Sequence, residues 1–178
     1  MEKFGFKTKI HLACSKDNLR PQFNYVYFID GFMYASDSYI LIKQSLGLHE
    51  IINPELLDGK CVHFDLYAKM LSYPIIEAIE EGINCITTQG GKLFFKYSEI
   101  DFKVPRFQLL LDDLEEEKSQ VGEIGLDSKK LKQLMSVMFL NQDRIKMTFH
   151  GESKAVKVTA IGIEEKDQVA LLMSVPII

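Results

Sequence analysis

Cysteine is scarce in this chain, with three among 178 residues, and the number is odd. Cys14, Cys61 and Cys85 each lie inside an apolar or alternating run, and none has a partner at the spacing of a disulfide framework. We therefore interpret them as reduced thiols of a hydrophobic core, which predicts a cytoplasmic protein. Because 47% of the residues are hydrophobic, a chain of this length can bury such a core without disulfides or metal ions.

Long apolar runs are also absent. No stretch approaches the roughly 20 consecutive apolar residues that a transmembrane helix needs. The sequence does not open with a basic segment followed by a long apolar one, as secretion signals do. We therefore expect neither membrane insertion nor secretion.

Positive charge is in deficit, because 21 lysine and arginine residues face 25 aspartate and glutamate residues, for a formal net charge of −4. This balance argues against a protein that wraps nucleic acid with its whole surface, but it leaves room for one basic face. The charges are unevenly spread: residues 112–117 carry five carboxylates, whereas Lys129, Lys130 and Lys132 lie within four positions.

Recognisable catalytic and cofactor-binding motifs are missing. The four histidines have no cysteine or histidine partner at the spacing of metal ligands. Gly90-Gly91 is typical of a turn rather than of a phosphate-binding loop, and no serine has the pattern of a nucleophile elbow. The sequence therefore predicts a non-catalytic protein without cofactor or metal. An unrelated α+β enzyme stays open as an alternative, since catalytic groups are assembled in space.

The first segment, up to residue 48, shows strand-like patterns separated by turn signals. We expect strands over residues 7–14, 25–29, 32–35 and 39–42, with Asp30-Gly31 as the turn between the second and the third. The stretch 15–21 is too polar and too short for a substantial helix, and its proline favours an extended chain. An antiparallel meander is the predicted structure.

A second unit follows with the order strand, helix, strand, strand, strand. Residues 60–64 are strand-like, and a helix over 65–73 is predicted, with Asp65 as its N-cap. Its apolar stripe consists of Leu66, Tyr67, Met70 and Leu71. Strands are then expected at 75–79, 83–88 and 92–97, with Gly90-Gly91 as a hairpin turn.

The same order returns after the acidic run. A strand at 123–126 precedes a helix over 127–139, which Asp127 or Ser128 caps. The apolar positions of this helix recur at i, i+3, i+4 and i+7, and they are Leu131, Leu134, Met135 and Met138. Three further strands are expected at 144–150, 155–160 and 169–175.

The two units match element for element, so the chain contains an internal repeat, and the first segment resembles a third copy without its helix. The predicted fold class is α+β, built from repeated β-α-β-β-β half-domain modules with antiparallel sheets. We expect one domain of two modules at residues 1–110, an acidic linker at 111–120 and a C-terminal half-domain at 121–178.

Several motifs of the chain resemble those of the bacterial DNA polymerase III beta subunit, the sliding clamp. The last unit carries the likeness best, in residues 123–135 and in the closing Ala-Leu-Leu-Met-Ser-Val-Pro-Ile. Residues 64–71 and 100–105 of the middle unit are similar, as are Leu19-Arg20-Pro21, Asp30-Gly31 and residues 34–37 of the first. Ser174 stands where the family has a proline. A family chain has six such modules, whereas this one has about three.

The resemblance implies a DNA clamp whose helices face duplex DNA and contact its phosphates without reading sequence, as in a polymerase processivity factor. The cations that would make these contacts are Lys129, Lys130, Lys132, Lys69, Arg20 and Lys16. The alternative for each of them is a solvated surface residue.

The resemblance also implies an apolar groove that receives peptides of DNA-processing proteins. Leu171, Met173 and Val175 are the matching positions, and a buried strand explains them equally well. A clamp-fold module that binds only proteins is the alternative function. Because a chain of about three modules is too small to encircle DNA alone, we expect a homo-oligomer.

Overall fold

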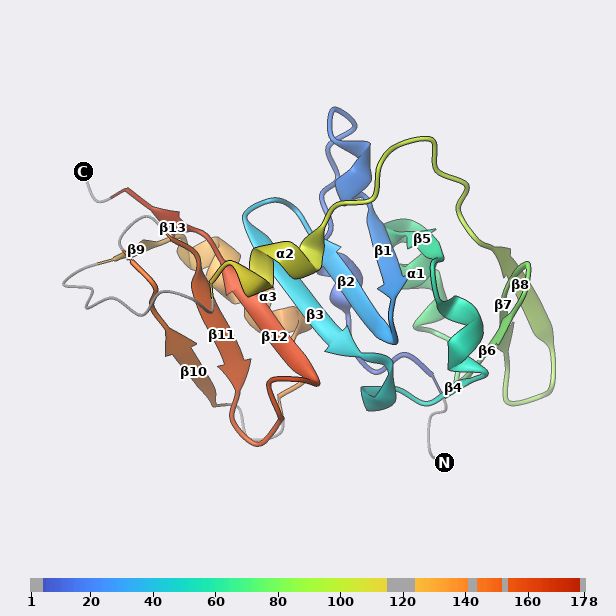
Figure 1. The fold of residues 1–178 in the computed structure, drawn as a ribbon. Coiled ribbons are helices and arrows are strands. Elements are labelled where there is room, and N and C mark those ends of the chain that lie inside the picture. The colour runs from blue at the N-terminus through green and yellow to red at the C-terminus, as the bar shows by residue number, and fades with distance from the viewer. Residues whose placement is uncertain (1–4, 115–123, 141–143, 152–153, 177–178) are drawn as a thin grey trace.

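The computed structural model describes residues 5–114, 124–140, 144–151 and 154–176. Its main layer is a seven-stranded antiparallel sheet in the order β10-β11-β12-β3-β2-β1-β5 (Figure 1). The strands of this sheet, in that order, are Ile145–Thr148, Val156–Ala160, Gln168–Leu172, Ile40–Ser45, Phe32–Ser36, Tyr25–Ile29 and Cys61–His63. The predicted α+β class with antiparallel sheets is thereby confirmed.

Two smaller sheets complete the strands of the described residues. A four-stranded sheet has the order β4-β6-β7-β8, and its strands are Ile51–Ile52, Ile75–Ile79, Gly82–Ile86 and Lys92–Lys96. Its β4–β6 pair is parallel, unlike the other pairs. A two-stranded sheet joins β9 (Gly125–Leu126) to β13 (Ser174–Val175).

The helices lie on both faces of the main sheet (Figure 1). Helices α1 (Phe64–Met70) and α3 (Ser128–Val137) share one core with the short 3-10 helix η1 (Ile10–Ala13). Helix α2 (Phe107–Asp112) packs on the opposite face. Successive residues of β2 point to the two faces in turn, as the alternation of a strand requires. Met33 accordingly belongs to the first core and Tyr34 to the second.

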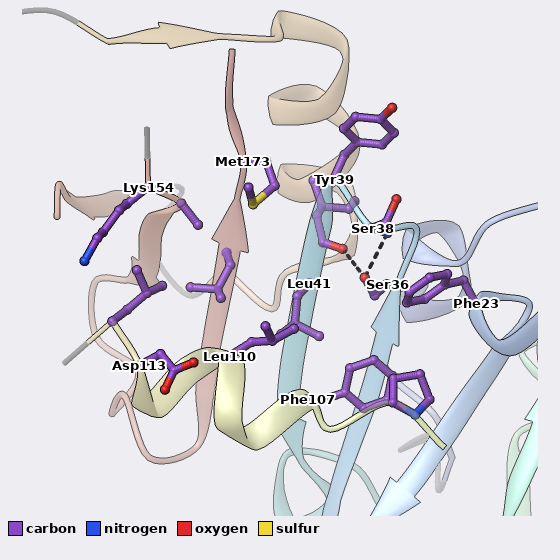
Figure 2. A pocket seen from close by; sticks show the side chains of 15 residues that line it. Phe23, Ser36, Ser38, Tyr39, Leu41, Phe107, Leu110, Asp113, Lys154 and Met173 are labelled. Carbon is purple, nitrogen blue, oxygen red and sulfur yellow. Dashed lines mark hydrogen bonds between the residues drawn. The ribbon is translucent and has the colours of Figure 1, made fainter. Parts of the chain in front are cut away.

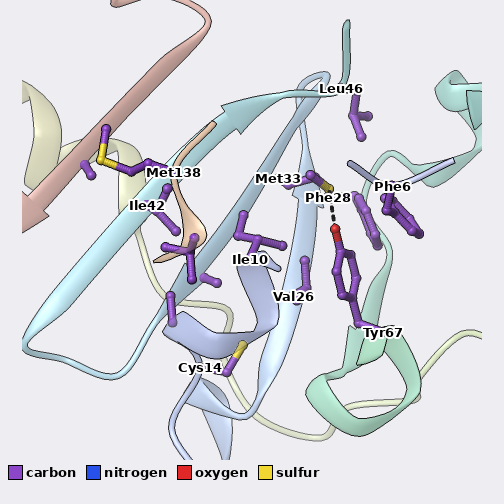
Figure 3. Packing of buried hydrophobic residues seen from close by; sticks show 14 of the residues in the cluster. Phe6, Ile10, Cys14, Val26, Phe28, Met33, Ile42, Leu46, Tyr67 and Met138 are labelled. Carbon is purple, nitrogen blue, oxygen red and sulfur yellow. Dashed lines mark hydrogen bonds between the residues drawn. The ribbon is translucent and has the colours of Figure 1, made fainter. Parts of the chain in front are cut away.

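The core under α1, α3 and η1 holds the larger share of the buried apolar side chains (Figure 3). Tyr67 of α1 is fully buried there, and its hydroxyl lies 3.2 Å from the carbonyl oxygen of Thr8 and 3.9 Å from the sulfur of Met33. Because a buried hydroxyl needs a hydrogen-bond partner, these contacts allow the ring to be inserted so deeply.

The clearest prediction from the sequence, the helix over 127–139, is confirmed as α3. The carboxylate of Asp127 accepts hydrogen bonds from the backbone N–H groups of Lys129 and Lys130, at 2.8 and 3.2 Å, and so caps the helix. Leu134 and Met138 are buried as expected, whereas Leu131 and Met135 are only partly buried.

The second predicted helix is present as α1, but its start and end differ. Its N-cap is His63 rather than Asp65, because the imidazole Nδ1 of His63 accepts the Asp65 N–H at 3.4 Å. The helix ends at Met70, before the predicted residue 73. The apolar stripe is correct, with Tyr67 and Met70 fully buried.

Two strand predictions need correction. Residues 7–14 do not form a strand: Ile10 and Ala13 are buried one helical turn apart, and the chain forms η1 between α1 and α3. The first module therefore keeps one 3-10 turn in place of its helix. The strand expected at 169–175 is interrupted at Met173, which separates β12 from β13.

Helix α2 was not expected from the sequence. Leu111 and Asp112, the first residues of the predicted acidic linker, belong to it, and residues 115–120 of that linker lie outside the described residues. The first and last modules are joined directly, because β3 pairs with β12 along five residues of each strand. In the described residues, no helix is long and apolar enough to cross a membrane.

Candidate functional site

A cavity of about 390 Å³ opens on the α2 side of the main sheet (Figure 2). It lies where the β2–β3 turn, helix α2 and the end of β12 meet. Leu171 and Met173, two of the predicted groove residues, line it. The third, Val175, is absent from the lining, since it lies in β13 opposite Gly125. Its lining also includes Ser36, Ser38, Tyr39, Phe107 and Leu110.

Aromatic packing fixes the wall that α2 gives to this apolar cavity. The ring of Phe107 stacks on Tyr34 with 5.4 Å between centroids and 9° between planes, and it lies 5.4 Å from the ring of Tyr27. Burial raises the pKa of Tyr34 to about 12, so this hydroxyl stays protonated. Elsewhere in the lining, Met173 is an exposed and unbranched side chain, which can adapt to ligands of different shapes.

A few polar side chains also line the apolar cavity. Asp113 and Lys154 line it on one side, and Ser38 lies on the other (Figure 2). Leu110, which lines the cavity, is 55% exposed, so part of the apolar lining is open to solvent. Such a cavity suits an apolar ligand with a few polar groups at its ends.

A second, more polar groove of about 710 Å³ lies on the helix face. Lys16, Arg20 and Lys130, all predicted DNA contacts, line it together with Asp17 and Asp37. Cations from two distant parts of the sequence, residues 16–20 and residue 130, are thus brought to one depression of the surface. Tyr39 is shared, since it lines both this groove and the apolar cavity.

The three cations of the groove already have contacts within the chain. The Lys130 ammonium forms an ion pair with the buried carboxylate of Asp37. Arg20 donates a hydrogen bond of 2.9 Å to the hydroxyl of Ser38. Lys16 lies 5.8 Å from the centroid of the Phe64 ring, within the range of a cation–π contact.

The other predicted cations, Lys69, Lys129 and Lys132, are exposed on α1 and α3. The helix-face segments 9–20, 64–72 and 127–137 together contain seven lysine or arginine residues and three aspartates, a local charge of +4. The whole chain has −4, so the remaining surface is strongly acidic by comparison. Positive charge therefore exceeds negative charge in these helix-face segments, although the chain as a whole is acidic.

The known proteins that match this chain are solved structures. No family model and no curated protein sequence matches it. A DNA polymerase sliding clamp from Pseudomonas aeruginosa matches with a TM-score of 0.66 and 13% identity, over 95% of this chain and 62% of that one. The DNA polymerase III beta subunit of Thermotoga maritima matches with a TM-score of 0.60 and 10% identity, over 96% and 62%. This chain has the sliding-clamp fold.

A clamp from Bartonella birtlesii bound to griselimycin also matches, with a TM-score of 0.54 and 14% identity, over 95% of this chain and 64% of that one. The chain therefore spans less than two thirds of the length of the clamps it matches. The clamp fold was predicted from sequence motifs, and these matches confirm that prediction for the fold.

Most residues of the apolar cavity were not predicted from the sequence. Its walls come from the β2–β3 turn and from α2, neither of which was proposed as part of a site. A signal for α2 was present, because Phe107, Leu110, Leu111 and Leu114 recur at i, i+3, i+4 and i+7. The described residues contain no group of three or more metal-ligating side chains.

Proposed function

We propose that this chain is a non-catalytic clamp-like protein that binds duplex DNA through its helix face, as a processivity-type factor. The concentration of charge carries this proposal: the helix-face segments have +4 in a chain of −4. Lysine and arginine at such positions attract phosphates without reading bases, and this mode of binding allows sliding. The three buried thiols fit a reducing, cytoplasmic location.

Binding to duplex DNA of two unrelated sequences tests this function. At low salt, fluorescence anisotropy should show the same affinity for both, and the affinity should fall steeply as salt rises. No binding at low salt, or a strong preference for one sequence, would contradict the proposal. The first outcome would favour the protein-only clamp-fold module, which has support in the ion pair that already holds Lys130.

The apolar cavity supports a second binding function, the capture of short apolar peptide segments from DNA-processing proteins. Leu171, Met173 and Leu110 give its lining an apolar surface, and Ser38, Asp113 and Lys154 add polar groups to it. Clamps of the same fold from Bartonella birtlesii and Pseudomonas aeruginosa are known bound to griselimycin. Griselimycin is therefore a suitable probe for this cavity.

Calorimetry with griselimycin can assign the cavity through a matched pair of variants. Leu110→Ser changes a cavity residue that is 55% exposed, and Leu109→Ser changes its neighbour on α2, which is 47% exposed and outside the lining. We expect weaker binding for Leu110→Ser and unchanged binding for Leu109→Ser. Equal affinities for both variants would place the ligand elsewhere.

A homo-oligomer is part of the proposed function. Strand β8 ends the four-stranded sheet, and its Leu93 and Phe94 are 46% and 48% exposed. An exposed apolar edge strand offers unpaired backbone groups and apolar area to another chain. Sedimentation velocity at micromolar concentration should show a particle larger than 20.4 kDa. A Phe94→Lys variant should then shift it towards the monomer, and a monomeric wild-type protein would contradict the proposal.

A further inference from the structure

The β2–β3 turn forms a wall between the apolar cavity and the polar groove. Ser36 and Ser38 line the cavity, Asp37 lines the groove, and Tyr39 lines both. Tyr39 is 53% exposed, so its ring lies at the surface between the two openings. A movement of this short segment therefore changes both sites at once.

The buried side chain of Asp37 stabilises the turn through hydrogen bonds. Its Oδ1 accepts hydrogen bonds from the backbone N–H groups of Tyr39 and Ile40, at 2.9 and 3.0 Å. Its Oδ2 accepts the ion-paired hydrogen bond from Lys130 and lies 3.5 Å from Nε2 of Gln133. The side chain of Asp37 is only 7% exposed, so its charge depends on Lys130 for compensation.

The turn is also strained and is tied to both sites. Ser38 has a backbone φ of +77°, in the left-handed region that residues other than glycine rarely adopt. Its hydroxyl accepts the hydrogen bond from Arg20, on the groove side. On the cavity side, the carbonyl oxygen of Tyr39 accepts a hydrogen bond of 2.8 Å from the N–H of Met173.

Groove and cavity thus contact the same strained segment through different residues. A phosphate in the groove would compete with Asp37 for Lys130 and with Ser38 for Arg20. The ammonium group of Lys130 has three N–H donors, which it already shares between Asp37 and Gln133. The guanidinium group of Arg20 holds its donors in a fixed fork. Once Lys130 turns to a phosphate, the carboxylate of Asp37 is left buried without its counter-charge. The turn must then shift to bring that carboxylate towards water, and Met173 loses its fixed partner.

We propose that the Asp37–Ser38–Tyr39 turn couples the two sites, so that phosphate bound in the groove weakens binding of an apolar ligand in the cavity. The proposal rests on the proposed DNA contact of the helix face. By thermodynamic linkage, a ligand in the cavity weakens binding of DNA by the same factor. The free protein is held in the state that favours the cavity, with Lys130 kept from DNA by Asp37.

A matched pair of charge-removing variants tests the role of Asp37. Asp37→Asn keeps an acceptor for the N–H groups of Tyr39 and Ile40 but loses the charge that holds Lys130. Asp17→Asn removes one negative charge from the same groove, where the carboxylate of Asp17 accepts a hydrogen bond of 2.9 Å from the N–H of Leu19. We expect Asp37→Asn to bind a 20-base-pair duplex several-fold more tightly than Asp17→Asn does. Equal affinities would mean that net charge alone matters, and they would overturn the proposal.

A titration of the wild-type protein gives a second measurement that needs no variant. The same duplex is added while backbone amide chemical shifts are followed by NMR. The amides of Tyr39 and Met173 should shift in proportion to the occupancy of the groove, whereas those of strand β8 should stay unchanged. If the amides of Lys130 and Arg20 shift but those of Tyr39 and Met173 do not, the coupling is overturned and DNA binding is kept. No binding of the duplex by the wild-type protein or by Asp37→Asn would overturn both.

Discussion

Gln44 and Gln168 are direct neighbours across strands β3 and β12, and both side chains are fully buried. Nε2 of Gln44 donates a 2.7 Å hydrogen bond to Oε1 of Gln168 and a 2.9 Å bond to the carbonyl oxygen of Val137. Gln168 also accepts the N–H of Phe139 at 2.7 Å and donates to its carbonyl oxygen at 3.0 Å. The junction between the first and last modules is thus a satisfied polar network, which fixes the register of the two strands.

Gln168→Leu should destabilise the protein by about 3 kcal/mol, because it leaves polar groups of Gln44 and Phe139 buried without partners. Urea denaturation followed by circular dichroism measures the loss. Gln89→Leu is the control, since Gln89 is exposed in the turn between β7 and β8, and it should cost less than about 1 kcal/mol. Equal losses would show that the network contributes nothing beyond an exposed glutamine.

Leu134→Ala should cost about 2–5 kcal/mol, since Leu134 is fully buried under α3 and its removal leaves a cavity. Ser136→Ala on the exposed face of the same helix serves as the control, with a change within about 0.5 kcal/mol. A loss below about 1 kcal/mol for Leu134→Ala in the same denaturation would mean that the core tolerates or refills the space.

We expect the free energy of unfolding to fall in weak acid, because the buried imidazole of His49 is neutral in the folded protein. Burial, together with the smaller effect of the nearby Lys7, lowers the pKa of His49 from its ordinary 6.5 to about 4. Its Nδ1 accepts the backbone N–H of Lys7 at 2.9 Å, which requires the neutral ring. The unfolded chain therefore takes up the proton first, and the stabilisation present above pH 6.5 is lost as pH falls towards 4.

This loss should reach up to about 3 kcal/mol at the acid end, from the size of the pKa difference. Denaturation at pH 7 and pH 5 gives the difference, and His49→Asn keeps an acceptor near Nδ1 but does not titrate. The variant should lose less stability between the two pH values than the wild-type protein does. An identical loss would assign the acid sensitivity to other groups, such as His11, whose pKa burial also lowers.

Replacing Lys129 and Lys132 by alanine should weaken duplex binding and reduce its salt dependence. Both are exposed on α3, and each phosphate contact that is lost should lower the slope of log K against log salt by about 0.9. Alanine at Lys103 and Lys166, which lie outside the helix-face segments, should leave the slope as it is. A slope that is unchanged in the first variant would make these lysines solvated surface residues.

Local patterns predicted the helices that have both a cap and a full apolar stripe. Asp127 and Leu134 are enough to locate α3, because both signals lie within one segment. η1 has buried residues over one turn only, so the stretch 7–14 was mistaken for a strand. For α1, the cap moved to His63, a residue type that ranks low among N-caps.

The sites were harder to predict, because they arise from contacts between distant segments. Met173 lies at the cavity because β12 pairs with β3. Tyr39 lines both the cavity and the groove, and the neighbouring Asp37 forms an ion pair with Lys130 of the distant helix α3. Lys16, Arg20 and Lys130 line one groove, but their role as DNA contacts stays a prediction. The pairing of Lys130 with Asp37 and of Arg20 with Ser38 could not be predicted from the sequence. The division into 1–110, 111–120 and 121–178 stays a prediction.

The pairing of β3 with β12 also sets the order in which the chain can fold. The bond between Gln44 and Gln168 spans 124 positions, so β3 keeps an open edge until residues 168–172 have left the ribosome. Pairings that are so distant in sequence are slow to form, and an open edge can meanwhile pair with another nascent chain. The last strand of the main sheet to be synthesised, β12, is thus the one that joins its two parts and protects the first module from misassembly.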